Sequence, residues 1–249
     1  MTSAEALTER LTKAERDQSH PPITIRDAAS ILILDRDDPK APKVLMGRRN
    51  SRHAFMPNRF VFPGGRVDPT DARVRLGADY DDVTLGKLTA HMRNKTGAAR
   101  ARALGVAALR EAYEETGVII GRRDAGALPA GAAWAPFADR NVSLDLGALR
   151  FVLRAITPPR RPRRFDTRFF VVDRAAVADI DPDCVGEDAE LEEIAWVTID
   201  EARGMDLPAI TVTVLDELTN RLADDPALTP GRPVPFYRYV RGRFERVTV

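Results

Sequence analysis

The chain is almost devoid of cysteine. Cys184 is the only cysteine among 249 residues, so no disulfide bond can form within the chain. A single cysteine close to acidic loop residues is typical of an incidental residue rather than of a nucleophile. We therefore expect the protein to belong to a reducing compartment, and we place it in the cytoplasm.

An excess of charge of one sign is also lacking. The chain has 38 Lys and Arg residues against 37 Asp and Glu residues, which gives a formal net charge of +1. A protein of this net charge produces no overall field that attracts DNA or an anionic membrane. We therefore expect no nucleic acid and no membrane among its partners.

Long hydrophobic runs are absent as well. No stretch approaches the roughly 18–20 apolar residues that a membrane-spanning helix needs. The segment from Met1 to Arg16 is polar and mixed in charge, unlike a secretory signal. The last residues, Arg246 to Val249, do not form a peroxisomal address of the S-K-L type. We expect a soluble protein, and its 249 residues are compatible with one large domain or with a domain that has appendages.

One segment, Arg110 to Val118, is unusually rich in acidic residues and reads Arg-Glu-Ala-Tyr-Glu-Glu-Thr-Gly-Val. On a helix, residues three and four apart share a face, so Glu111 lies beside Glu114 and Glu115. Three carboxylates on one patch repel each other unless a cation lies among them. Mg²⁺ prefers oxygen ligands of this kind, usually together with substrate phosphates. The segment therefore predicts a site for Mg²⁺ or Mn²⁺.

The same segment has a simpler interpretation. It would then be a solvated acidic helix face, with Gly117 as the C-terminal cap of the helix. A second landmark upstream, Phe62-Pro63-Gly64-Gly65, favours a functional site. Gly64 and Gly65 allow the backbone to turn sharply and to approach a ligand closely.

With both segments in view, the chain resembles the Nudix hydrolases. Their signature is G-x5-E-x7-R-E-U-x-E-E-x-G-U, where U is an apolar residue. The chain matches the second half at every fixed position from Arg110 to Val118, and it matches the first half at Gly65. Two departures exist, because Asp71 stands where the family has Glu, and the gap from Asp71 to Arg110 is longer by roughly thirty residues.

The long insert, together with several flanking segments, resembles the acyl-CoA and coenzyme A diphosphatase branch of the family. These segments are Gly47-Arg48-Arg49, Phe55-Met56-Pro57, Phe60 to Gly65, Val67-Asp68 and Arg164 to Phe170. The resemblance implies a Nudix-type α/β/α sandwich with a mixed sheet and a helical insert in the signature. We expect an N-terminal helical extension over residues 1–22 and a Nudix domain over residues 23–249, with the insert at about 66–101.

The hydrophobic pattern agrees with an α/β fold of interleaved helices, strands and hairpins. We expect helices over residues 3–17, 81–94, 98–116 and 211–222, a short helix that opens at 200–202, and one capped by Ser143 that runs through Leu149. We expect strands over residues 28–34, 43–47, 60–62, 118–120, 165–172 and 194–197, with a terminal hairpin over 237–249. Residues 124–142, rich in Ala, Gly and Pro, predict a surface excursion.

The resemblance also implies roles for the residues of the signature. Glu114 and Glu115 are the surest metal ligands, joined by Glu111 and by the backbone carbonyl of Gly65. Arg110 holds a glutamate in place rather than touching the substrate; the alternative is an ordinary surface ion pair worth well under about 1 kcal/mol. The shorter Asp71 either replaces the family glutamate or caps the start of the insert helix.

A general base must reach the attacking water, and in this family it often comes from a loop outside the signature. The acidic loop over residues 186–193 is the natural source, with Glu190 as the first candidate and Glu187 as the second. The alternative is a loop that is merely solvated. For substrate binding we predict four arginines, whose planar forks suit phosphate groups, although ordinary surface basicity explains any single one equally well. They are Arg49, Arg59, Arg164 and Arg168.

These residues together predict Mg²⁺- or Mn²⁺-dependent hydrolysis of a diphosphate bond in a nucleoside diphosphate derivative. The branch resemblance favours coenzyme A or acyl-CoA, cleaved to phosphopantetheine and adenosine 3′,5′-bisphosphate. ADP-ribose or NADH is the alternative substrate, and a non-catalytic nucleotide-binding sensor is the alternative of another class. The expected partner is a small-molecule nucleotide, and the sequence leaves a homodimer open.

Overall fold

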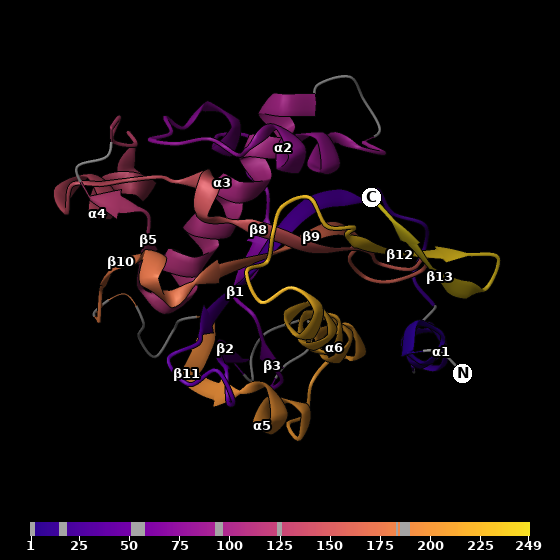
Figure 1. Ribbon diagram of the computed structural model, residues 1–249. Coiled ribbons are helices and arrows are strands. Elements are labelled where there is room, and N and C mark those ends of the chain that lie inside the picture. The colour runs from indigo at the N-terminus through magenta and orange to yellow at the C-terminus, as the bar shows by residue number, and fades with distance from the viewer. Residues whose placement is uncertain are drawn as a thin grey trace.

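The computed structural model describes residues 3–14, 19–50, 58–92, 97–123, 126–182, 184 and 190–249. Phe55 to Pro57 and the candidate base Glu187 lie outside this part of the chain. The model has a central sheet between two helical layers (Figure 1).

The central sheet is mixed, as the sequence predicts. Its strands follow the order β11-β2-β1-β9-β8-β12-β13, with β3 paired to β2 and β4 paired to β1. The β1–β9 and β8–β12 pairs are parallel, and the other pairs are antiparallel. The strands are β1 (Arg26–Asp35), β2 (Lys43–Arg49), β3 (Phe60–Val61), β4 (Gly64–Arg66), β8 (Arg150–Ile156), β9 (Phe165–Asp173), β11 (Leu191–Thr198), β12 (Pro235–Val240) and β13 (Arg243–Thr248).

Two small antiparallel ladders form separate two-stranded sheets. They pair β5 (Val118–Ile120) with β10 (Val177–Ile180), and β6 (Arg122–Arg123) with β7 (Val142–Ser143). The α-helices are α1 (Ser3–Lys13), α2 (Asp82–Thr89), α3 (Gly97–Thr116), α4 (Ala135–Asp139), α5 (Ile199–Arg203) and α6 (Ala209–Asp224). Short 3₁₀ turns are η1 (Asp71–Arg73), η2 (Ala132–Trp134), η3 (Leu146–Ala148) and η4 (Arg174–Ala176). None of the described helices is both long and apolar enough to cross a bilayer.

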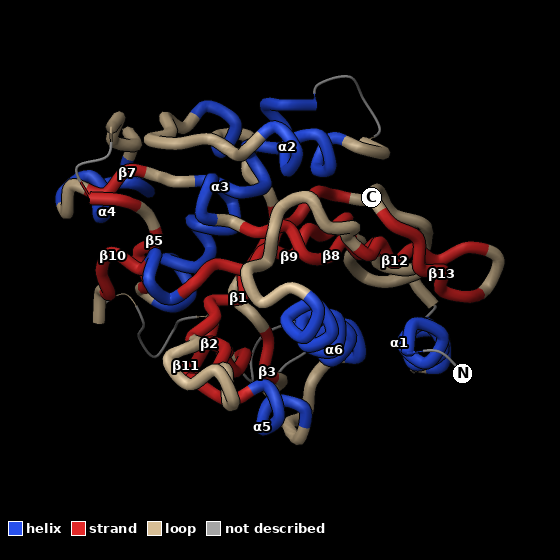
Figure 2. The backbone as a smooth tube through the Cα atoms, in the orientation of Figure 1, coloured by secondary structure: helices blue, strands red, loops and turns tan. Residues whose placement is uncertain are grey.

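Strand β1 is buried on both faces because successive side chains point to opposite sides of a sheet. Ile31 and Ile33 pack with α3 in one core, whereas Leu32 and Leu34 pack with α6 in the other. Figure 2 shows α3 and α6 on different sides of the strands. The predicted α/β/α sandwich with a mixed sheet is therefore confirmed.

The helix that carries the acidic segment was predicted closely. It begins at Gly97 and ends at Thr116, and Gly117 follows with φ of +71°. Ala107 and Ala108 of this helix are completely buried in the core.

Three local expectations are wrong. Ser143 caps no helix; it lies in β7 and donates a hydrogen bond from its hydroxyl to the Arg122 carbonyl at 3.1 Å. The region 124–142 is not only a surface excursion, since Trp134 and Phe137 are buried and their ring centroids lie 5.1 Å apart. The insert helix ends at Thr89 rather than at Asn94, and His91 then adopts a φ of +57°.

Helix α1 is part of the packing rather than a detached arm. Leu7 and Leu11 are buried in the core that contains α6, and the Thr12 hydroxyl accepts a 2.9 Å hydrogen bond from the Phe244 amide of β13.

We predict that Leu11→Ala lowers the free energy of unfolding by about 2–4 kcal/mol, because it leaves a cavity in this core. The exposed neighbour gives the control: Glu5→Ala changes it by less than about 0.5 kcal/mol. Equal urea midpoints for the two variants would show that α1 does not contribute to stability.

Candidate active site and metal centre

The candidate site lies where β4 contacts the last turns of α3. We call Gly64 and Gly65 of β4 the glycine segment. Strand β4 pairs with β1 so that Gly65 lies opposite Ala29, and α3 packs across both strands. A methyl group at Gly65 would collide with the carboxylate of Glu111. Glycine at this position therefore lets the loop backbone and the helix carboxylate lie in direct contact.

Arg110 links the helix to this loop. Its Nη1 donates to Glu111 Oε1 at 2.9 Å and to Glu114 Oε2 at 2.8 Å, while Nη2 donates to the Arg66 carbonyl at 3.0 Å. Burial opposes the charge of the guanidinium, but hydrogen bonding to Asp71 and the nearby glutamates outweigh it and raise the pKa of Arg110. Arg110 is therefore a fixed cation that orients two of the three predicted metal ligands.

Asp71 completes this arrangement and is 1% exposed. Its two oxygens accept hydrogen bonds from Arg110 Nε at 3.0 Å and Nη2 at 3.2 Å, and Oδ2 also accepts from the Asp68 amide at 2.8 Å. The alternative role as a cap of the insert helix is wrong, since α2 has Asp81 as its N-cap. Asp71 thus holds Arg110, and the spacing of six residues from Gly65 was the signal in the sequence.

Glu115 is the most deeply buried of the three glutamates Glu111, Glu114 and Glu115, at 3% exposed. Its Oε2 accepts a 2.9 Å hydrogen bond from the Gly64 amide, but its buried Oε1 has no hydrogen-bond partner. Burial raises the pKa of Glu115 well above its ordinary range, and the negative charges of Glu190 and Glu111 raise it further. The Gly64 amide and the Arg49 guanidinium lower the pKa of Glu115 and offset this rise only in part.

Glu111 experiences the same excess of negative charge. Burial raises its pKa, the Arg110 guanidinium lowers it, and Glu114 and Glu190 raise it again. Glu114 is the outermost of the three, with a side chain that is 44% exposed. Of the three glutamates, Glu115 is thus buried and Glu114 reaches solvent.

The three predicted metal ligands do not yet converge on one point. Among the residues that the structure describes, no three His, Cys, Asp or Glu side chains are gathered closely enough to hold a metal ion. Glu111 and Glu114 both pair with Arg110 Nη1, at 2.9 and 2.8 Å. The residues nevertheless fit a divalent cation, because Glu115 Oε1 is an unpartnered buried oxygen among mutually repelling carboxylates.

Two residues from other parts of the chain lie beside this cluster. They are Arg49 at the end of β2 and Glu190 directly before β11. Glu190 lies near enough to Glu111 and Glu115 to raise the pKa of both. Its carboxylate forms an ion pair of 3.0 Å with Arg49 Nη1, and its carbonyl accepts a 3.0 Å hydrogen bond from the Asn50 amide. The predicted base and one predicted substrate arginine therefore lie together beside the carboxylates.

The other predicted substrate arginines lie in three different settings. Arg59 is half-exposed and lies 3.5 Å from an Asp206 oxygen. Arg164 is in the connection between β8 and β9, where its Nε donates to the Thr157 carbonyl at 3.1 Å.

Arg168 does not fit a substrate-binding role. It is 1% exposed, and its Nη1 lies 3.0 Å from an Asp166 oxygen and 3.2 Å from an Asp27 oxygen. Burial in the sheet layer excludes contact with a ligand from solvent. We therefore remove Arg168 from the substrate-binding set.

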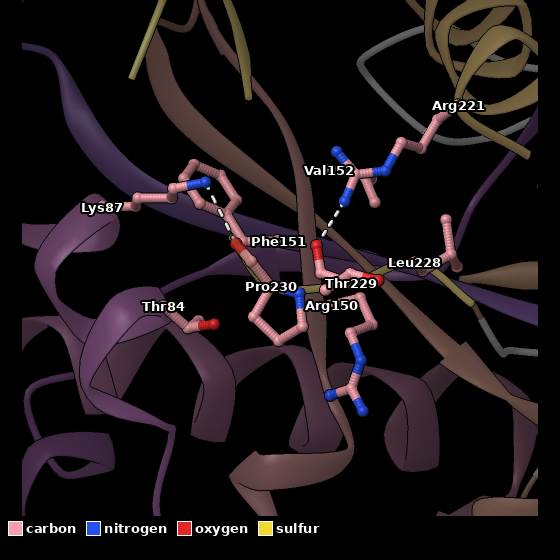
Figure 3. A pocket seen from close by; sticks show the side chains of 9 residues that line it. All are labelled: Thr84, Lys87, Arg150, Phe151, Val152, Arg221, Leu228, Thr229 and Pro230. Carbon is pink, nitrogen blue, oxygen red and sulfur yellow. Dashed lines mark hydrogen bonds between the residues drawn. The ribbon is translucent and has the colours of Figure 1, made fainter. Parts of the chain in front are cut away.

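A separate pocket lies between α2, β8 and the segment before β12 (Figure 3). Lys87 donates to the Pro230 carbonyl at 3.0 Å, and Arg221 donates to the Thr229 carbonyl at 2.5 Å. None of the acidic residues of the candidate site lines this pocket. Its cations tie the segment before β12 to α2 and α6, and we assign it a structural role.

The buried pair of Asp71 and Arg110 leads to a stability prediction. Asp71→Asn leaves the buried guanidinium with a weaker partner, so we expect the free energy of unfolding to fall by about 3 kcal/mol. Asp37 is exposed in the β1–β2 turn and provides the matched control. Chemical denaturation should show an unchanged midpoint for Asp37→Asn. Equal midpoints for both variants would contradict the role of Asp71.

The raised pKa of Glu115 leads to a prediction of opposite sign. In buffer with a chelator at pH 8, Glu115→Gln should increase the free energy of unfolding on the order of 1–2 kcal/mol, because it removes a buried charge. At pH 4 the difference should be close to zero, since most of the wild-type carboxyl is then protonated in both the folded and the unfolded state. The exposed Glu114→Gln is the control and should change stability by less than about 0.5 kcal/mol. A Glu115→Gln protein that is less stable than wild type at pH 8 would refute this explanation.

Known proteins were compared with the chain. No family model matches it. The Caenorhabditis elegans protein named "Putative nudix hydrolase 7" is 29% identical over 192 residues, which are 71% of this chain and 54% of that protein. The chain therefore spans about half the length of this curated relative.

A solved structure provides the comparison of fold. The NUDIX hydrolase from Alicyclobacillus acidocaldarius is 28% identical, with a TM-score of 0.56, and the match covers 77% of this chain and 90% of that one. The fold of the described residues is the Nudix fold. In both sequence and fold, the chain is thus similar to Nudix hydrolases.

Proposed function

We propose that the protein hydrolyses a diphosphate bond in a nucleoside diphosphate derivative, with Mg²⁺ or Mn²⁺ as its cofactor. The observation that carries this proposal is Glu115, a buried carboxylate with an unpartnered oxygen, next to the glycine segment and two further glutamates. The Nudix fold and the matched signature support the same reaction.

The metal would be held by Glu111, Glu114, Glu115 and the backbone carbonyl of Gly65. When bound, such a cation neutralises diphosphate oxygens and stabilises the charge that develops on the leaving phosphate. Arg110 keeps the carboxylates of Glu111 and Glu114 oriented, and Asp71 keeps Arg110 in place. A catalytic role for Arg110 is therefore one of positioning.

Glu190 is our proposed general base. It lies beside the carboxylate cluster, and Arg49 fixes its side chain through the 3.0 Å ion pair. In the proposed reaction a water oxygen bonds to one phosphorus, Glu190 accepts a proton of that water, and the bond from this phosphorus to the bridging oxygen breaks. The products are two phosphate monoesters, and no oxidant or further reactant is needed.

Coenzyme A or an acyl-CoA is the substrate that we favour. The sequence resemblance to the diphosphatase branch supports it. The insert, which contains η1 and α2 between β4 and α3 along the chain, is part of that resemblance. Arg49, Arg59 and Arg164 remain the arginines that we propose for phosphate contacts. ADP-ribose or NADH is the runner-up, because the signature determines the chemistry and leaves the rest of the substrate open.

A protein that only binds nucleotides, as a sensor or scaffold, is the alternative of another class. Such proteins generally lose the glutamates of the signature, and here Glu111, Glu114 and Glu115 are all present. Asp71, which stands where the family has Glu, and the insert are the two features in its favour. The contacts of Asp71 with Arg110 account for it as a replacement instead.

A substrate panel tests these proposals. Purified protein is incubated with Mg²⁺ and coenzyme A, acetyl-CoA, ADP-ribose or NADH, and the products are separated by chromatography. We expect phosphopantetheine and adenosine 3′,5′-bisphosphate from coenzyme A, with a higher kcat/KM than for ADP-ribose or NADH.

Glu115→Gln should lower kcat by about 10²-fold or more, because it removes a ligand charge.

Each contrary result has a distinct meaning. Equal or faster turnover of ADP-ribose would refute the coenzyme A assignment but leave the hydrolase intact. Full activity of Glu115→Gln would refute the metal site. A wild-type protein that binds these compounds but cleaves none would favour the sensor.

A further inference from the structure

Arginines gather at one end of the central sheet. This end is formed by the start of β1, the connection between β8 and β9 (residues 157–164) and the turn between β12 and β13. Because β8 and β12 run parallel, with Ala155 opposite Tyr237, both connections emerge at the same end. Arg26 joins them, since it lies opposite Phe165 at the start of β9. Figure 1 shows the β12–β13 turn at one extremity of the molecule.

Six arginines of this end carry uncompensated charge. In the described part of the chain, none of them makes a side-chain hydrogen bond or an ion pair, and all but the half-buried Arg161 are exposed. They are Arg26, Arg160, Arg161, Arg163, Arg241 and Arg243, which we call the arginine edge. A seventh, Arg238, contacts Glu245 at 3.4 Å.

Two aspartates on the strands of the arginine edge, Asp27 on β1 and Asp166 on β9, do not neutralise it. Asp166 binds Arg154 through two hydrogen bonds of 2.7 and 2.8 Å, and it also pairs with Arg168. Asp27 binds Arg100 and Arg168. Both aspartates are thus already occupied by buried or half-buried arginines, so the charge of the edge faces solvent.

The two connections hold this charge in a defined shape. Pro158, Pro159 and Pro162 restrict the first connection, and Arg160 at its tip has a φ of +60°. In the second, Arg241 and Gly242 have φ values of +47° and +89°, which is the left-handed pair of a tight hairpin turn.

The arginine edge is long as well as charged. It crosses the ends of five adjacent strands, β1, β9, β8, β12 and β13, which corresponds to roughly 19 Å at the usual strand spacing. A single dinucleotide diphosphate is too short to engage all six side chains. Several successive phosphates of a polyanion match this length, since duplex DNA presents one charge per roughly 1.7 Å of its axis.

We propose that the arginine edge binds the phosphate backbone of a nucleic acid without regard to sequence. Arginine forks suit phosphate oxygens, and the edge contains no lysine. A membrane surface fits less well, because the large apolar side chains exposed in the described residues are Val83 on α2 and Ile180 on β10. Neither belongs to the strands of the edge, which therefore offers no side chain for insertion.

This inference departs from our expectation that no nucleic acid binds. The net charge of +1 averages over the whole chain and conceals the separation of charge within it. The proposal does not depend on the hydrolase activity, and the two can fail independently.

Fluorescence anisotropy on the full chain tests the proposal. A labelled 20-base-pair DNA duplex and a labelled 20-nucleotide RNA are titrated at 50 to 200 mM salt. We expect affinity to fall steeply with salt, and Arg241→Glu with Arg243→Glu to weaken binding at least tenfold at low salt. Arg160→Glu with Arg163→Glu should do the same. In the alanine versions, each lost phosphate contact should reduce the slope of log affinity against log salt by about 0.9.

The matched control changes the same number of charges at the opposite end of β1. Lys40 and Lys43 are exposed beside the β1–β2 turn, so Lys40→Glu with Lys43→Glu should change affinity less than twofold. Circular dichroism checks that each variant is folded. Absence of binding at 50 mM salt, or equal loss in the control, would overturn the proposal. So would binding to phosphatidylserine vesicles with none to either nucleic acid.

Discussion

The site depends on one interaction, the guanidinium of Arg110 held by Asp71. From this anchor Arg110 reaches Glu111, Glu114 and the carbonyl of Arg66, so it fixes α3 against the glycine segment. Elements from different parts of the chain are thereby joined at the place where the carboxylates lie. Without a buried partner, a cation in this position would carry a desolvation cost of several kcal/mol.

Glu115 shows what this arrangement costs the fold. A carboxylate that is 3% exposed, next to Glu111 and near Glu190, is destabilising as long as nothing neutralises it. Its raised pKa expresses that penalty, and a divalent cation is the ligand whose charge and oxygen preference would relieve it. The negative charge of Glu115 thus lowers stability in the absence of a metal ion, and the same charge is needed to bind one.

The sequence predicted those parts of the molecule that depend on local pattern. Helix α3 follows from its periodicity and from Gly117, and the β1–β2 hairpin follows from an apolar run before a turn. Ser143 and Trp134 were misplaced because tertiary pairing and burial decide their state, not the residues beside them. The inward position of Arg168 and the concentration of charge at the arginine edge required the order of the strands, which a single chain does not reveal.

The central claim is that the carboxylates around Glu115 hold a divalent cation. Titration of Mn²⁺ followed by electron paramagnetic resonance tests it directly, since bound and free Mn²⁺ give different signals. The account predicts one bound ion per chain in the wild type, together with at least tenfold weaker binding in Glu115→Gln. Equal Mn²⁺ affinity in the two proteins would contradict it.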